Sequence, residues 1–97
     1  MIKTERRLRV PDDVAAIIRS LHPGLKRKIK AGLQRLLDDA EAGKALKDEL
    51  SGLRSFRVGK LRIVYRFPSK AVIEIFAVGP RKTIYEETLR FVHAKRK

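Results

Sequence analysis

The chain has 97 residues, which suffices for one folded domain, and we expect a single domain over residues 1–97. It has no cysteine, which excludes disulfides and cysteine-ligated zinc and favours a cytoplasmic location. Lysine and arginine number 24 against 11 acidic residues, a formal net charge of +13. No apolar run is long enough to cross a membrane. This excess of positive charge predicts an acidic protein or a nucleic acid as partner.

The first half of the chain predicts a short strand followed by two helices. Residues Thr4–Val10 are predicted as an edge strand that Pro11 ends. A helix begins at Asp12-Asp13, where carboxylates suit the positive helix end, and a second follows over Leu25–Leu37. Both have apolar stripes at helical spacing: Val14, Ile17, Ile18 and Leu21 in the first, and Leu25, Ile29, Leu33, Leu36 and Leu37 in the second. The two helices form a hairpin that packs on another layer.

After Gly52 the apolar period becomes 2, which predicts strands. The strands cover Arg54–Val58, Leu61–Phe67 and Ala71–Val78. Their connections, Gly59-Lys60 and Pro68-Ser69-Lys70, are too short for parallel crossovers, so neighbouring strands are antiparallel. Gly79-Pro80 ends the last strand, and Thr83 caps a final helix that reaches about Ala94; Leu46 and Leu50 anchor the polar connection Lys44–Gly52. The predicted fold is α+β: an N-terminal helical hairpin packed on a small antiparallel sheet of about four strands, with a C-terminal helix.

Basic charge is concentrated in the segment from Leu53 to Lys82, where Glu74 is the single acid. In the strand Leu61–Phe67, alternation places Leu61, Ile63, Tyr65 and Phe67 on the face under the helices, with Tyr65 in the core. It places Arg62, Val64 and Arg66 on the opposite face, which we expect to be partly open to solvent. Arginine suits phosphate because its planar fork binds phosphate oxygens bidentately and keeps its charge.

Two motifs in this segment resemble the RelE-like branch of the RelE/ParE superfamily of toxins from type II toxin–antitoxin systems. They are GLRSFRVGKLRIVY at residues 52–65 and IFAVGPRKTIY at residues 75–85. The resemblance implies an endoribonuclease, or mRNA interferase, that cuts mRNA in the ribosomal A site and arrests translation. It also implies attack by the ribose 2′-hydroxyl to leave a 2′,3′-cyclic phosphate, without metal or cofactor, and neutralisation by a cognate antitoxin.

The resemblance also assigns roles to individual residues. By position, Arg62 and Arg81 match the family's phosphate-binding and transition-state arginines, and Arg81 also matches a proton donor to the leaving group. Tyr85 matches the tyrosine that stacks on or orients the substrate, and Arg57 matches a basic position on the preceding strand. Ser55 stands where many relatives have a second basic residue, so the general base is not identified.

Four further basic residues in the same segment are predicted to bind RNA: Arg54, Lys60, Arg66 and Lys82. No grouping of acidic residues or histidines suits a metal ion, so no metal site is expected. Two alternatives remain open. The chain could be a ParE-like toxin that inhibits DNA gyrase without cutting nucleic acid, or a degenerate member that only binds its antitoxin or nucleic acid.

Overall fold

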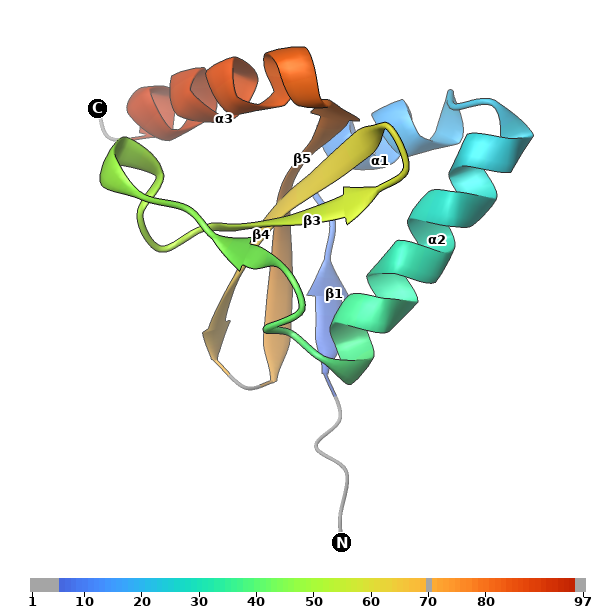
Figure 1. Ribbon diagram of the computed structural model, residues 1–97, viewed down its shortest axis with the longest axis horizontal. Coiled ribbons are helices and arrows are strands. Elements are labelled where there is room, and N and C mark those ends of the chain that lie inside the picture. The colour runs from blue at the N-terminus through green and yellow to red at the C-terminus, as the bar shows by residue number, and fades with distance from the viewer. Residues whose placement is uncertain (1–5, 70, 96–97) are drawn as a thin grey trace, which may run out of the picture.

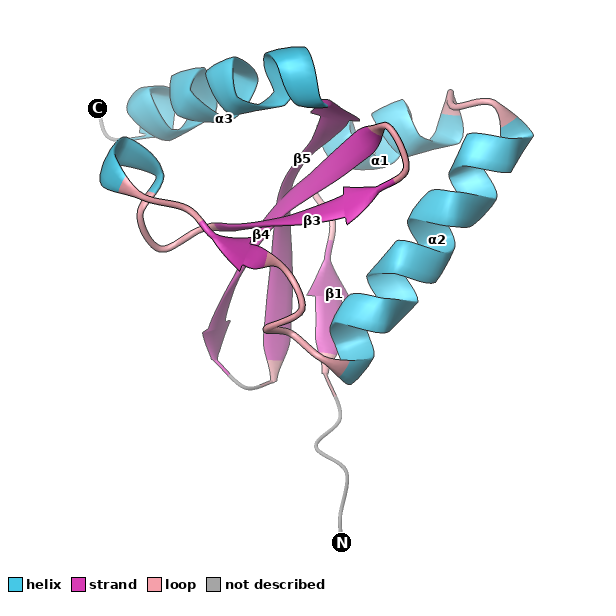
Figure 2. Ribbon diagram, in the orientation of Figure 1, coloured by secondary structure: helices cyan, strands magenta, loops and turns pink. Residues whose placement is uncertain are grey.

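The computed structural model describes residues 6–69 and 71–95, which form two helical layers on either side of a mostly antiparallel sheet (Figures 1 and 2). The predicted α+β class is confirmed. In chain order the elements are β1 (Arg7–Arg9), α1 (Asp12–Arg19), α2 (Pro23–Asp38), β2 (Lys44–Ala45), a single 3-10 turn η1 (Asp48–Leu50), β3 (Arg54–Val58), β4 (Leu61–Ser69), β5 (Val72–Pro80) and α3 (Arg81–Lys95).

The described part of the chain forms a five-stranded sheet in the order β1-β5-β4-β3-β2. The predicted antiparallel meander forms its centre, and Gly59-Lys60 is the tight turn that joins Val58 to its partner Leu61. Two predicted strand ends were wrong. Strand β4 runs through Pro68, because the pairing with β5 is irregular between Arg66 and Ser69, where a missing N–H costs no ladder hydrogen bond. Strand β5 continues through Pro80.

The predicted N-terminal strand is present but shorter, and it pairs in an unexpected direction. Strand β1 lies parallel to β5, with Leu8 beside Ile73. The two strands are far apart in sequence, and the intervening elements supply the long connection that parallel pairing requires. Together β1 and β2 add short outer strands to the three-stranded meander. Thr4 and Glu5 lie outside the described residues.

Helices α1 and α2 cover one face of the sheet and enclose the larger core. Ile29 and Leu36 of α2 and Ile63 and Tyr65 of β4 are each fully buried in it, as their sequence periods predict. The predicted stripe of α1 is correct except for Ile17, which is 44% exposed. Val14, Ile18 and Leu21 pack in or against the larger core, whereas Ile17 lies at the edge of the contact with the sheet.

Helix α3 covers the apolar middle of the opposite face of the sheet, while Arg62 stays half-buried and Arg66 exposed, so the expectation that this face is partly open is confirmed. It starts directly after β5 and folds back over the strands (Figure 1). Val64 of β4 and Ile84 of α3 itself are fully buried at this contact, and Leu46 and Leu50 pack against the same cluster as predicted. Thr83 lies within the first turn of α3 and therefore does not cap it. As a result, the arginines of this face are separated by a covered apolar strip. None of the helices in the described ranges is long and apolar enough to cross a membrane.

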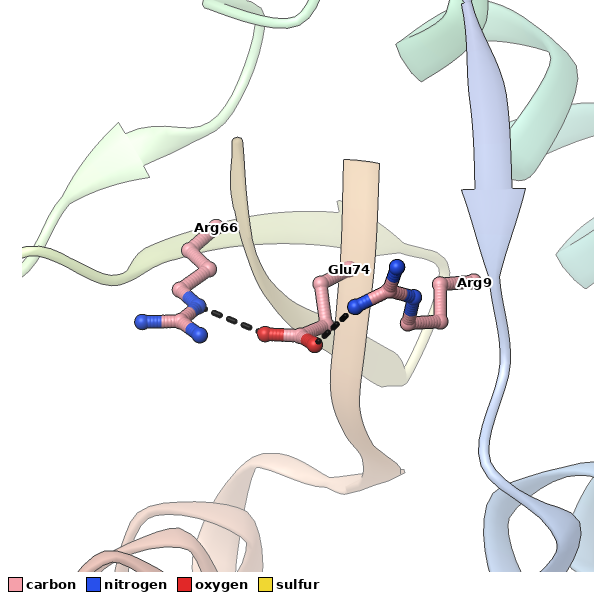
Figure 3. A network of polar contacts seen from close by, with 3 residues as sticks. All are labelled: Arg9, Arg66 and Glu74. Atoms are coloured by element: carbon pink, nitrogen blue, oxygen red, sulfur yellow. Dashed lines mark hydrogen bonds and ion pairs between the residues drawn. The ribbon is translucent and has the colours of Figure 1, made fainter. Parts of the chain in front are cut away.

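A three-residue network holds the outer strand β1 to the sheet (Figure 3). Glu74 of β5 accepts a hydrogen bond of 2.6 Å from Arg66 Nε of β4, and its other carboxylate oxygen lies 3.5 Å from a terminal nitrogen of Arg9. Burial alone would raise the pKa of Glu74. The hydrogen bonds and charges of Arg66 and Arg9 outweigh it and hold that pKa below its ordinary value of 4.5. The ionised carboxylate therefore stabilises the folded protein.

We expect Glu74→Gln to lower the free energy of unfolding at neutral pH by about 0.5–1 kcal/mol, because both arginine partners are partly exposed. Since the folded-state pKa of Glu74 is depressed, its contribution is present above pH 4.5 and is lost as the pH falls through that lower pKa. Urea unfolding of both proteins across this range measures the effect. A difference that stayed constant down to the acid end would contradict the assignment.

Candidate anion-binding site

The β3–β4 hairpin brings two of the predicted catalytic residues side by side. Arg57 and Arg62 are direct cross-strand partners on the α3 face, one pair before the turn. The turn depends on Gly59, whose φ of +60° favours glycine, and the space around its Cα is open. Side chains on directly opposed residues start about 5 Å apart, so the two guanidinium groups share one region of the surface.

The end of β5 delivers the third predicted catalytic arginine to the same region. Across the sheet Arg62 faces Gly79, which presents no side chain over the arginine pair. Pro80 then leads without a loop into α3, so Arg81 and Lys82 form the first turn of the helix. The positive end of a helix adds to the attraction for an anion at this position.

These residues line a shallow pocket of about 370 Å³. Its lining consists of Arg57, Gly59, Lys60, Arg62, Pro80, Arg81 and Lys82. The structure therefore brings together five of the eight residues that the sequence assigned to catalysis or RNA binding. No carboxylate or imidazole contributes to this lining.

The charges in this pocket are not neutralised within the described part of the molecule. The ion pairs between described side chains are those of Glu74, and none involves a lining residue. Among the described residues, Arg57 donates one hydrogen bond, from its Nε to the carbonyl oxygen of Gly59 at 3.3 Å. Like charges directly opposite each other on a sheet are destabilising, so the Arg57–Arg62 pair opposes folding unless an anion lies between them. A phosphate group has the charge and the spread of oxygens to do so.

Two of the predicted RNA-binding residues lie elsewhere and have partners of their own. Arg66 binds Glu74, and its guanidinium lies 5.4 Å from the ring centre of Phe76, beside a second pocket of about 280 Å³. Arg54 lies on the α2 face of the sheet, opposite Tyr65 in the pairing of β3 with β4. Its Nε donates to the carbonyl oxygen of Gly43 at 3.0 Å and a terminal nitrogen donates to that of Glu41 at 3.1 Å.

Tyr85 also lies outside the pocket lining. Its ring packs against the apolar cluster under α3, and its hydroxyl lies 3.0 Å from the Oγ of Ser55 on β3. Ser55 is 4% exposed. Ser55, which the resemblance matches to a second basic residue in many relatives, thus forms a pair of hydroxyl groups with Tyr85. Strand alternation puts Ser55 on the face of Arg57, but its contact with a helix residue was not visible in the sequence.

The solved structures that resemble this chain show its fold, and a family model shows its family. No curated protein matches the chain in sequence. Among solved structures, the RelB–RelE toxin–antitoxin complex from Mycobacterium tuberculosis contains a similar chain, with a TM-score of 0.70, 24% identity, and coverage of 79% of this chain and 99% of that one. A mutant of Escherichia coli RelE in the free state is similar with a TM-score of 0.70 at 18% identity, over 95% of this chain and 97% of that one.

The archaeal RelE–RelB complex from Pyrococcus horikoshii gives a TM-score of 0.62 at 25% identity, over 81% of this chain and 97% of that one. The likeness to these structures shows a shared fold and agrees with the motifs at residues 52–65 and 75–85. Residues 6–85 match the family model described as the ParE toxin of type II toxin–antitoxin systems. This chain therefore belongs to the ParE toxin family, within the RelE/ParE superfamily of type II toxin–antitoxin systems.

Proposed function

We propose that this toxin is a metal-independent endoribonuclease that cuts mRNA on the ribosome, with the scissile phosphate held by Arg57, Arg62 and Arg81. One observation carries the proposal: five cationic side chains meet around one pocket whose described lining contains no acid. A folded protein retains such an arrangement at a cost in stability, and a bound phosphodiester removes that cost. The proposed site of action is the cytoplasm, where mRNA is translated.

In the proposed reaction the ribose 2′-hydroxyl attacks the adjacent phosphorus and the 5′ oxygen of the next nucleotide leaves. Negative charge develops on the non-bridging oxygens, where Arg62 and Arg81 donate hydrogen bonds. Arg81 also donates a proton to the departing 5′ oxygen and regains one from water. The products are a 2′,3′-cyclic phosphate and a 5′-hydroxyl end.

The proton of the attacking hydroxyl needs an acceptor. The pocket lining contains neither a carboxylate nor an imidazole that could accept it. The proposal therefore assigns the acceptor to water or to a group of the ribosome. Free RNA should then be cut slowly by the purified toxin, and mRNA on a translating ribosome much faster.

Mapping RNA ends in cells after induction tests the proposed function. We expect new 5′-hydroxyl ends inside translated regions, in phase with codons, and matching cyclic phosphate ends upstream. The Arg62→Ala/Arg81→Ala double variant serves as the control and should produce none. Growth arrest without new RNA ends would refute the proposed cleavage.

A second candidate function is inhibition of DNA gyrase without nucleolytic chemistry. It is supported by the match to the ParE family model and by the hydroxyl pair at Ser55, where a second basic residue would otherwise stand. It predicts induction of the DNA-damage response without RNA cleavage, and inhibition of supercoiling by purified gyrase. The same induction experiment separates the two candidates.

We further propose a cognate antitoxin with acidic segments as the protein partner. The net charge of +13 favours such segments, and several similar chains were solved as toxin–antitoxin complexes.

A further inference from the structure

The placement of Arg81 depends on how α3 is held against the sheet. Ile84 and Thr88 are both fully buried at this contact, but the hydroxyl of Thr88 donates back to the carbonyl oxygen of Ile84 inside the helix. Apart from one hydrogen bond of Tyr85, the contacts that the described side chains of α3 make with the sheet are apolar. Apolar burial turns this side of the helix toward the sheet, but because it has no preferred direction it sets the rotation of the helix about its own axis only coarsely.

One polar contact sets the rotation of α3 about its axis more closely. Among the described side chains, the Ser55–Tyr85 hydrogen bond of 3.0 Å is the one that joins α3 to a strand. Ser55 is almost completely buried, so breaking the bond leaves a hydroxyl without a partner in an apolar environment. Tyr85 lies four residues after Arg81, hence on the same side of the helix and one turn further along.

We propose that the Ser55–Tyr85 pair is a positioning device that fixes the rotation of α3 and so directs Arg81 at the pocket. Tyr85 then acts through Arg81 and does not contact the RNA. The consequence for RNA rests on the proposed function, whereas the consequence for α3 does not.

Hydrogen exchange tests the structural half of this inference on the intact protein. Tyr85→Phe and Ser55→Ala each remove one hydroxyl and keep most of the packing. We expect amides of residues 85–90 to exchange about five- to tenfold faster in either variant, while β4 and β5 amides keep their rates. The double variant should exchange no faster than either single one, and Ser55→Thr, which keeps a hydroxyl, should restore slow exchange. Equal acceleration throughout the protein, or none, would overturn the inference.

Binding of a short fluorescent single-stranded RNA tests the other half. Tyr85→Phe and Ser55→Ala should weaken binding by the same factor, and the double variant should lose no more. Weakening by Tyr85→Phe alone would mean that Tyr85 contacts RNA and would overturn the positioning role. If both variants loosen α3 but the native protein neither binds nor cuts RNA, the positioning of the helix stands and the proposed function falls.

Discussion

Replacing Arg81 by alanine is expected to abolish growth arrest and mRNA cleavage while leaving the fold and antitoxin binding intact. The side chain lies at the start of α3 and lines the pocket beside Arg62. Removing one preorganised donor to a developing oxyanion typically slows a reaction by about 10²–10³-fold. Because Arg81 is exposed and forms no ion pair with a described side chain, its loss should change stability by less than about 0.5 kcal/mol.

Arg90→Ala is the matched control for this variant. Arg90 is the same residue type on the same helix, is also exposed, and does not line the pocket. Growth after induction, cleavage on purified ribosomes, and co-purification with the antitoxin should all resemble the native protein. A fully toxic Arg81→Ala protein would show that the pocket is not the reactive site. Equal losses in both variants would show that only net charge matters.

The parts of the fold set by local periodicity could be predicted from the sequence. The stripe of α2 and the alternation of β4 each repeat over several residues, so the burial of Ile29, Ile63 and Tyr65 followed from them. The pairing of Arg57 with Arg62 was equally accessible, because a two-residue turn at Gly59-Lys60 fixes the register of its hairpin.

The parts that depend on contacts between distant segments could not be predicted in this way. Alternation separates the two faces of β4, but it does not say which helix covers each one. Val64, an apolar residue between two arginines on the partly open face, was the local sign that α3 packs there. The ion pair between Arg66 and Glu74 depends on a register shift between β4 and β5, which no local sequence pattern encodes.

The site itself combines both kinds of information. The placement of Arg57 beside Arg62 follows from the local pattern of the hairpin. Arg81 joins them because β5 continues through Pro80 and α3 begins without a loop. A helix starting three residues later, with Thr83 as its cap, would have left Arg81 in a connecting segment with no fixed direction. The Ser55–Tyr85 contact arises from the same geometry.

A second large effect is expected at Tyr65, where Tyr65→Phe should lower the free energy of unfolding by about 2–4 kcal/mol. The hydroxyl of this fully buried residue donates to the carbonyl oxygen of Ala40 at 2.6 Å and accepts from the amide of Gly43 at 3.0 Å. Both backbone groups lose their partner when the hydroxyl is removed. The backbone of Gly43 lies so close to Tyr65 that a Cβ at this residue would lie 2.6 Å from the hydroxyl oxygen, so only glycine fits at this position.

The chain's other tyrosine provides the control for this prediction. Tyr85→Phe also removes one hydroxyl, but its single described partner is another side chain, so its loss should be smaller. Burial raises the pKa of Tyr65, against the opposing effects of the Gly43 amide and Arg54. The stabilisation that depends on its neutral form is therefore present below pH 10 and is lost as the pH rises through the folded-state pKa. Chemical unfolding at pH 7 and at alkaline pH measures both effects. If Tyr65→Phe lost no more stability than Tyr85→Phe at pH 7, the two backbone hydrogen bonds of Tyr65 would not hold the 40–43 turn as we infer.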